Sequence, residues 1–379
     1  MIYFDNAATS FPKPKSVVRA VQELIASPLG NPGRSGHKLS LAADRIVYEA
    51  RETLASVLGL DKPENIIFTA GCTASLNTAI LGTVQALEKR RPKPLCVTSV
   101  LEHNAVLRPL YALEKMGRIT LRILPVDENG KTDLAVLPRT PDLVCLTMRS
   151  NVTGRAVART AVSFFKEKGS VILMDAAQFL GHDAETPFAR GADIVCAPGH
   201  KGLMGIMGGG FLAVSDTCPI LPEAVFSGGS GNASFSPAMP DDLPERLEAG
   251  TLPVPAIAAM KEGTLFCRSV GFETIASHEK ELKQLLLEGI DAIPNLVLYD
   301  KHIPTGPLLF NHRTVPSADF CRRMEQEGLL ARGGFHCAPL THRLLGTEKT
   351  GGVRLSPGFF NTKKEVQSAL AILNRLAKG

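Results

Sequence analysis

The sequence has no tryptophan and only four tyrosines among its 379 residues, and it lacks several patterns that mark particular protein classes. Lysine and arginine number 42 against 37 aspartates and glutamates, with no basic block that has aromatic residues interleaved. A nucleic-acid partner is therefore not expected. No apolar run reaches the ~18 residues that a membrane-spanning helix needs, so no membrane association is expected either. The N-terminus has no signal-peptide pattern, which favours a cytoplasmic protein.

The eight cysteines include no Cys-x-x-Cys pair. A zinc or iron–sulfur site held by this chain is therefore not expected, and we predict no metal ligands. Cys96, Cys145 and Cys196 lie in apolar, strand-like runs. We interpret these three as small buried hydrophobic residues.

Hydrophobic residues make up 44% of the chain, and its length suggests two or more domains. Apolar residues at helical spacing predict helices over 13–26 and 39–60. Continuous apolar runs predict strands at 65–69, 94–99, 119–124, 142–147, 171–175, 193–197 and 209–214. Strands of this kind separated by helical segments predict an α/β fold, with a mostly parallel sheet covered by helices on both faces.

The second half of the chain begins with a segment that has no clear periodicity. Residues 227–255 are rich in glycine, serine and proline, and we interpret them as a functional loop rather than a linker. A long helical stretch is expected to begin near Ala256 and to lead into a smaller α+β portion that ends at residue 379.

Polar residues follow several predicted strands, where ligands of open α/β sheets bind. After the strand at 65–69, the stretch "AGCTASLNTAI" offers backbone N–H groups at a helix start and the Thr73 hydroxyl, which together suit a phosphate. Helix capping by Thr73 is an equally good interpretation. His103 lies just past the strand at 94–99. A lone histidine in a loop is more often structural than catalytic.

Asp175 and Lys201 give a sharper signal. Asp175 ends an apolar strand, and a buried carboxylate needs a cationic partner, such as the protonated pyridine nitrogen of pyridoxal phosphate (PLP). A helix N-cap is the alternative. Lys201 lies in the stretch "APGHKGLMGIMGGG". In a desolvated pocket its pKa would fall, so that it could hold an aldehyde as a neutral nucleophile. The alternative is an ordinary surface lysine.

Ten segments occur in an order and spacing typical of one family: "YFDNAAT", "GRSGHKLS", "AGCTASLN", "LEHNA", "SNVTG", "LMDAAQ", "GHK", "LEAGT", "RGGFHCA" and "VRLSPGFFNT". With them, nearly the whole chain resembles the class V aminotransferase family of fold type I PLP enzymes. Within that family it resembles the branch of cysteine desulfurases and selenocysteine lyases. The resemblance implies a large PLP-binding domain at 15–255 and a small α+β domain formed by 1–14 and 256–379.

The resemblance also implies roles for individual residues. Lys201 would hold PLP as a Schiff base, Asp175 would pair with the pyridine nitrogen, and His103 would stack on the ring and shuttle protons. The remaining cofactor contacts, to the ring hydroxyl and the phosphate, would come from Gln178, Asn151, Thr73 and His200. Thr251 would reach the phosphate in a neighbouring subunit, which implies a homodimer.

One position departs from the family pattern at the phosphate. Pro198 stands where many relatives have a serine that helps to hold this group, and proline brings neither a hydroxyl nor an N–H. We expect either a lower cofactor affinity or compensation by Cys72 and backbone groups.

For the substrate, the resemblance implies that Arg354 binds the carboxylate in bidentate fashion, as a guanidinium suits. Arg332 and Asn151 are expected nearby. Cys337 occupies the position where desulfurases place the thiol that attacks substrate sulfur. Its sequence neighbours include four basic residues expected to favour the thiolate: Arg332, His336, His342 and Arg343. Only 17 positions separate Cys337 from Arg354, which resembles the second group of desulfurases, with a compact cysteine loop.

The implied activity is a cysteine desulfurase that converts L-cysteine to L-alanine, leaves a persulfide on an enzyme cysteine, and passes the sulfur to an acceptor protein. Three alternatives stay open: a selenocysteine lyase, a class V aminotransferase without sulfur transfer, and a non-catalytic scaffold for sulfur-transfer partners. A nucleotide-binding oxidoreductase is not expected, because no Gly-x-Gly-x-x-Gly follows the first strand.

Overall fold

The computed structural model describes residues 1–33, 36–232 and 234–378, so Arg34 and Ser35 of the segment "GRSGHKLS" lie outside the described residues. Within these ranges the central sheet has seven strands. In spatial order they are β2 (Ile66–Thr69), β8 (Gly210–Val214), β7 (Ile194–Pro198), β6 (Val171–Asp175), β5 (Leu143–Thr147), β3 (Leu95–Ser99) and β4 (Thr120–Leu124). Each predicted strand is present, with ends within one residue of those expected.

The sheet is mostly parallel, as predicted, and β8 is the exception. Strands β7, β6, β5, β3 and β4 run parallel to one another, whereas β8 is antiparallel to both β7 and β2. The loop at 199–209 that joins β7 to β8 is too short for the helical crossover that a parallel pair requires. The chain therefore turns back directly at the carboxyl end of β7.

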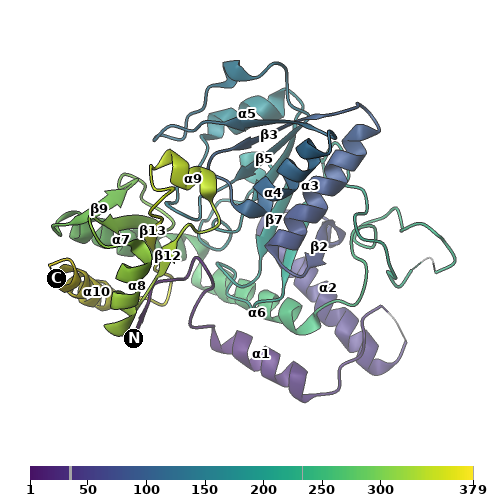
Figure 1. Ribbon diagram of the computed structural model, residues 1–379. Coiled ribbons are helices and arrows are strands. Elements are labelled where there is room, and N and C mark those ends of the chain that lie inside the picture. The colour runs from purple at the N-terminus through teal and green to yellow at the C-terminus, as the bar shows by residue number, and fades with distance from the viewer. Residues whose placement is uncertain (34–35, 233, 379) are drawn as a thin grey trace.

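Two hydrophobic layers cover the sheet. Alternate residues of the central strands belong to opposite layers, so that Cys145 packs with one and Val144 with the other. One layer contains α3 (Cys72–Glu88) and α4 (Asn104–Lys115), and the other contains α2 (Lys38–Leu58), α5 (Arg159–Glu167) and the start of α6 (Val254–Val270). Figure 1 shows α3 and α4 lying together on one side of the sheet. The predicted burial of Cys96, Cys145 and Cys196 is confirmed.

A second, smaller sheet in the C-terminal part has the order β12 (Arg332–Gly334), β13 (Gly352–Leu355), β10 (Leu308–His312) and β9 (Leu296–Tyr299). A third core packs this sheet with α7 (Phe272–Asp291), α8 (Ser317–Gln326) and α10 (Lys363–Leu376). Near the N-terminus, β1 (Ile2–Tyr3) pairs in parallel with β11 (Leu329–Leu330), and Phe4 joins the third core. The domain boundary at 255/256 stays a prediction.

The remaining elements are short or peripheral. Helix α1 (Lys15–Ala26) begins after Pro14 and packs on α6, and α9 (Pro339–Leu344) lies between β12 and β13 in the chain. The 3₁₀ turns are η1 (Pro63–Asn65), η2 (Leu134–Val136) and η3 (Phe188–Arg190). Across the part of the chain that the structure describes, no helix combines the length and apolarity needed to cross a bilayer.

The predicted loop at 227–255 has no helix or strand in its described residues before α6 begins at Val254, two residues earlier than expected. Glu248 anchors the end of this loop to the central sheet. Its carboxylate accepts the backbone N–H of Phe68 and pairs with Arg51, and both charged side chains are only 8% exposed. The guanidinium of Arg51 also lies over the Phe68 ring.

A buried lysine joins the C-terminal part to the loop that follows β5. Lys283 on α7 is 1% exposed. Its Nζ donates to the carbonyl oxygens of Thr153 at 3.1 Å, Thr305 at 2.8 Å and Pro307 at 2.9 Å. Because buried polar groups are costly when unpaired, this amine and the three carbonyls stabilise the joint mutually.

We predict that Lys283→Met lowers the free energy of unfolding by at least about 2 kcal/mol, because it leaves several buried carbonyl groups without their donor. Chemical denaturation of the cofactor-free protein measures the change. The control is Lys280→Met on the exposed side of the same helix, which should change the value by less than about 0.5 kcal/mol. Equal effects of the two substitutions would contradict the bonding role of Lys283.

Candidate active site

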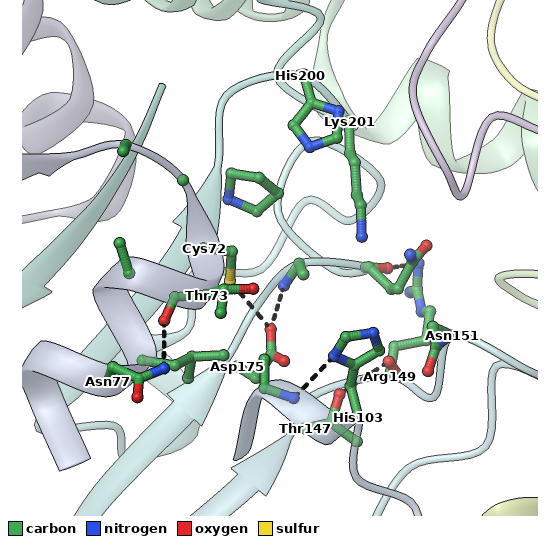
Figure 2. A pocket seen from close by; sticks show the side chains of 18 of the residues that line it. Cys72, Thr73, Asn77, His103, Thr147, Arg149, Asn151, Asp175, His200 and Lys201 are labelled. Atoms are coloured by element: carbon green, nitrogen blue, oxygen red, sulfur yellow. Dashed lines mark hydrogen bonds between the residues drawn. The ribbon is translucent and has the colours of Figure 1, made fainter. Parts of the chain in front are cut away.

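A cavity of about 600 Å³ lies at the carboxyl ends of β5, β6 and β7, beside the start of α3 (Figure 2). Its lining includes eight of the predicted site residues: Cys72, Thr73, His103, Asn151, Asp175, Gln178, His200 and Lys201. Pro198 also lines it. The structure therefore brings together residues from five separate segments of the chain.

The first turn of α3 forms one wall of the cavity. Its N-cap is Gly71, with φ 146° and ψ 172°, and no side chain caps the helix. Thr73 is therefore not the helix cap, and the first N–H groups of the helix have no intrahelical partner. That backbone conformation is essentially open only to glycine. Gly210 allows close packing behind it, since a Cβ there would lie 2.7 Å from Gly71 Cα.

Asp175 is 4% exposed at the end of β6. Its Oδ1 accepts the N–H of Ala177 at 2.9 Å and the thiol of Cys72 at 3.6 Å (Figure 2). Burial, and then the charge of Asp175, raise the pKa of Cys72 well above its usual value, so Cys72 is a thiol that donates. No regular helix begins after Asp175, so the N-cap alternative does not describe it. The carboxylate lacks a cationic hydrogen-bond partner here and faces the cavity.

Lys201 extends into the same cavity from the loop between β7 and β8 (Figure 2). Burial is the main cause that lowers its pKa, and the charges of Arg354 and Arg332 act in the same direction. Asp175 and Cys72 oppose the shift only partly. An amine of this kind has a larger neutral fraction at physiological pH than an exposed lysine, which makes it a better nucleophile and base.

The residue before Lys201 is held by the N-terminal segment. The carbonyl of His200 accepts the N–H of Ser10 at 3.0 Å, Lys13 Nζ at 3.0 Å and Thr9 Oγ1 at 3.1 Å. Burial, with Lys201 and Lys13 nearby, lowers the pKa of His200 to about 4. The ring is therefore neutral, and its buried Nδ1 has no hydrogen-bond partner among the residues that the structure describes.

His103 both caps a helix and lines the cavity. It is the N-cap of α4, where its Nδ1 accepts the N–H of Ala105 at 3.0 Å. Its pKa is lowered, mainly by burial, which favours the neutral ring. Because Nδ1 is an acceptor, the single ring hydrogen lies on Nε2. The two interpretations of His103 from the sequence are therefore compatible.

Asn151 connects the cavity to the segment that carries Cys337. Its Nδ2 donates to the His336 carbonyl at 2.7 Å, and its own carbonyl accepts Arg354 Nη1 at 3.0 Å. The carbonyl of Cys337 accepts the N–H of Asn104, next to His103, at 2.7 Å. The Cys337 side chain is exposed. The hydrogen bonds from Asn151 and Asn104 hold the loop that carries Cys337, the cysteine loop, against the wall of the cavity.

The histidines near Cys337 contribute no positive charge. Burial lowers the pKa of His336 to about 3, with Arg354 as a second cause, and burial also lowers the pKa of His342. Of the four basic neighbours expected to favour a thiolate, these two histidines are therefore mostly neutral near pH 7. The sequence does not show that the two histidines are buried.

Four predicted residues do not line the cavity: Cys337, Arg332, Arg354 and Thr251. Arg354 is 1% exposed and pairs with Asp5, with 2.7 Å between Nη2 and Oδ1, while its Nε is buried without a partner. Arg332 is exposed, and its backbone lies opposite that of Arg354 in the antiparallel register of β12 and β13. Thr251 is exposed at the end of the 227–255 loop, where it accepts a long hydrogen bond from Asn31. Their roles stay predictions.

Sequence reasoning missed two acidic residues at this site. Asp5, within the quoted segment "YFDNAAT", received no role, although it pairs with Arg354, which lies 349 positions away in the chain. Glu102 precedes His103, is fully buried, and accepts Ser99 Oγ at 2.6 Å. Burial raises the pKa of Glu102 to about 8, so this acid is mostly protonated at neutral pH. Its only sequence signal was its place beside a histidine at a strand end.

Comparison with known proteins places this site in a family. A family model described as "Aminotransferase class-V" matches residues 2–369. A protein named "probable cysteine desulfurase" from Methanothermobacter thermautotrophicus is 30% identical over 390 residues, covering 99% of this chain and 94% of the relative. One of the same name from Pyrococcus abyssi is 30% identical over 392 residues, covering 100% of this chain and 94% of the relative.

Two solved structures are similar over almost the full length. The apo structure of a cysteine desulfurase from Thermococcus onnurineus NA1 has a TM-score of 0.89 and 28% identity, covering 100% of this chain and 95% of that one. The cysteine desulfurase CsdA from Escherichia coli, in an S-sulfonic acid form, has a TM-score of 0.86 and 26% identity, covering 99% and 94%.

We predict that Lys201 in the cofactor-free protein is labelled at lower pH than the exposed Lys280, because burial lowers its pKa below the ordinary value of a lysine. Reductive methylation over a pH series, quantified for each lysine by peptide mass spectrometry, gives the midpoint of each titration. The midpoint is compared rather than the absolute rate, which also depends on access. A midpoint for Lys201 equal to that of Lys280 would contradict the neutral amine.

Proposed function

Because its sequence matches the class-V aminotransferase family over residues 2–369, the chain belongs to that family, and we propose that it is a PLP-dependent cysteine desulfurase converting L-cysteine to L-alanine. The observation that carries the proposal is the position of Cys337. Its loop is hydrogen-bonded to Asn104 and Asn151, at the wall of the cavity that contains Lys201. Two relatives of that name at 30% identity, and two structures that bear it, support the same activity.

The residues of the cavity fit PLP. The uncapped start of α3, the Thr73 hydroxyl and the unpartnered Nδ1 of His200 suit its phosphate. Asp175 supplies a buried negative charge for the ring nitrogen, and Lys201 an amine for the aldehyde. Pro198 adds no donor to the phosphate, which leaves the helix N–H groups as the main contacts. The cavity has a size typical of small-molecule sites.

The bound cofactor supplies an electron sink for the carbanion formed at the substrate Cα. The protein residues supply the rest of the chemistry. Ala177 and Cys72 donate to Oδ1 of Asp175 and hold this carboxylate where it would pair with the ring nitrogen. Lys201 would hold the aldehyde through its amine, and its lowered pKa favours the neutral form when the amine is free. It then removes the proton from the substrate Cα as a general base.

Sulfur transfer falls to Cys337. Its thiolate attacks the substrate sulfur, so that an S–S bond forms and the Cβ–S bond of the substrate breaks. The electron pair of that bond remains on the substrate carbon skeleton, which takes up one proton at Cβ, regains one at Cα and leaves as alanine. The net reaction is L-cysteine plus enzyme thiol to L-alanine plus enzyme persulfide. His103, with its hydrogen on Nε2, is the proton donor and acceptor beside the reacting atoms.

Arg354 is the proposed ligand of the substrate carboxylate. Its guanidinium is held by the Asn151 carbonyl and by Asp5, and its Nε has no partner. A bound carboxylate would therefore share this guanidinium with Asp5 or displace it. Arg332, its neighbour across the small sheet, adds positive charge at the same place. Asn151 contributes by holding both Arg354 and the cysteine loop.

A homodimer is the proposed assembly. Thr251 is exposed and lies outside the cavity of its own chain, so a contact with the phosphate requires a second copy. Exposed apolar side chains on α1 and α2, among them Ile25 and Leu41, offer a surface for that copy. Eight free cysteines suit a reducing cytoplasmic location. The exposure of Cys337 lets an acceptor protein take the sulfur.

Selenocysteine is a second candidate substrate for the same site. A selenol is more acidic than a thiol and leaves without nucleophilic help, so Cys337 would be dispensable for it. Alanine formation from cysteine and from selenocysteine, compared in the Cys337 variant described below, separates the two substrates.

We predict that Lys201→Ala abolishes the visible absorbance band that PLP shows when it is joined covalently to a lysine. The reason is that Lys201 is the amine that lines the cavity beside Asp175. Absorbance spectra recorded after adding PLP measure this directly. Lys280→Ala, which changes an exposed lysine, should retain the full band. An unchanged band in Lys201→Ala would refute the covalent assignment.

We predict that Cys337→Ser lowers alanine formation from L-cysteine by at least about 100-fold, because a hydroxyl is a poor nucleophile toward sulfur. The PLP absorbance should stay that of the unchanged protein, since Cys337 does not line the cavity. Cys218→Ser, at a half-buried cysteine in the loop after β8, is the matched control. Full activity of Cys337→Ser would mean that Cys337 is not the sulfur carrier. Formation of a new amino acid from an amino acid and a 2-oxo acid, without alanine formation from cysteine, would instead indicate a class V aminotransferase without sulfur transfer.

A further inference from the structure

Two buried histidines and a threonine form a hydrogen-bonded chain behind the Cys337 loop. His336, His342 and Thr347 are 3%, 0% and 1% exposed. His336 Nδ1 lies 3.1 Å from His342 Nε2, and His342 Nδ1 lies 2.8 Å from Thr347 Oγ1. At the other end, His336 Nε2 lies 3.1 Å from the Arg332 carbonyl oxygen. The angle between the planes of the two imidazole rings is 18°.

The Arg332 carbonyl decides the direction of this chain. A carbonyl oxygen can only accept, so His336 Nε2 must carry a hydrogen. Burial keeps His336 neutral, and a neutral ring has one N–H, so its Nδ1 accepts from His342 Nε2. By the same count, His342 Nδ1 accepts the Thr347 hydroxyl. Each of the three contacts then has one donor hydrogen. If every donor and acceptor were exchanged, the lone pair of His336 Nε2 would face the lone pairs of the Arg332 carbonyl oxygen.

The Thr347 hydroxyl has one competing acceptor. The carbonyl of His342 lies 3.2 Å from Oγ1, farther than the 2.8 Å to His342 Nδ1. A hydroxyl has a single hydrogen and cannot satisfy both acceptors at once. That carbonyl already accepts the N–H of Thr347 at 2.8 Å, whereas the buried Nδ1 has only the hydroxyl. The ring nitrogen is therefore where the hydrogen is needed.

The loop that this chain supports has an unfavourable backbone. His336 and Cys337 have φ values of 51° and 54°, in the left-handed region that residues other than glycine rarely occupy. The loop's own backbone closes the turn, with the N–H of Ala338 donating to the Phe335 carbonyl at 3.0 Å. Asn151, in the loop after β5, donates to the His336 carbonyl, and Asn104, at the start of α4, donates to the Cys337 carbonyl. The imidazole of His336 is a further attachment, and it is bonded to His342.

We propose that His342 and Thr347 are positioning residues for Cys337: Thr347 donates to His342, His342 donates to His336, and the fixed His336 ring holds the left-handed turn that presents the thiol to the cavity. The inference rests on the proposed function in one respect, because it takes Cys337 as the thiol that attacks substrate sulfur. The chain acts on geometry and transfers no proton to the substrate.

Thr347→Val tests the proposal, since valine keeps the shape of threonine and removes the donor, and Thr347→Ser is the matched variant that keeps the donor. We expect Thr347→Val to lower kcat for alanine formation roughly 10- to 100-fold, because small misplacements of a reacting group have effects of that size. KM for cysteine should stay within about twofold, since the Thr347 hydroxyl bonds to His342 and not to Arg354, the proposed carboxylate ligand. Thr347→Ser should retain most of the wild-type kcat. A valine variant with wild-type kcat, or equal losses in both variants, would overturn the proposal.

A second readout does not depend on desulfurase activity. Iodoacetamide alkylation of Cys337, followed by peptide mass spectrometry, should be at least as fast in Thr347→Val as in Thr347→Ser, because the thiol is already exposed and the loop is less restrained. Amide hydrogen exchange of the peptide spanning 333–338 should be faster in the valine variant. Equal exchange in the two variants overturns the positioning role. Absence of alanine formation in the unchanged protein instead overturns the proposed function.

If Thr347→Val does not fold, a second pair of variants makes the same comparison. The amide of His342→Gln can donate to His336 Nδ1, whereas His342→Leu cannot. We expect kcat to be at least about tenfold higher in the glutamine variant. Equal kcat values in a folded pair would overturn the proposal.

Discussion

The site depends on keeping an amine and a carboxylate in one cavity, where burial acts on both. Burial lowers the pKa of Lys201 and would penalise an unpaired charge on Asp175. Two donors, the N–H of Ala177 and the thiol of Cys72, hold the carboxylate in place. The cavity therefore combines a carboxylate suited to a cationic ring nitrogen with a nearby amine whose pKa is lowered by burial.

Backbone carbonyls and one asparagine assemble the rest of the site from distant segments. The His200 carbonyl collects donors from residues 9–13, which fixes the loop that carries Lys201. Asn151 holds the cysteine loop through its side chain and Arg354 through its carbonyl. The segments that carry the proposed cofactor, substrate and sulfur residues are thus connected through a few shared contacts. Replacing the Asn151 side chain would remove its bond to the cysteine loop, whereas the backbone carbonyl that accepts from Arg354 would remain.

Much of the large sheet could be predicted from the sequence, because buried strands are continuous apolar runs with few alternatives. Asp175 and Lys201 could be identified for the same reason, since a charge directly after such a run has little access to water. The direction of β8 was not predicted, because it depends on the length of the loop at 199–209 rather than on the composition of the strand. The pairing of Asp5 with Arg354, and the neutral state of His336, depend on contacts between residues far apart in the chain. Periodicity carries no information about such contacts.

The pairing of β1 with β11 has a consequence for biosynthesis. Ile2 lies beside Leu329, so the first strand has no partner until most of the chain has left the ribosome. Residues 9–13, which clamp the loop before Lys201, belong to the same early segment. The nascent large sheet can form while its N-terminal extension is still unattached. Lys201, the proposed cofactor-binding lysine, would then reach its final setting only when the C-terminal third emerges, so that a cofactor held by it would be bound late in maturation.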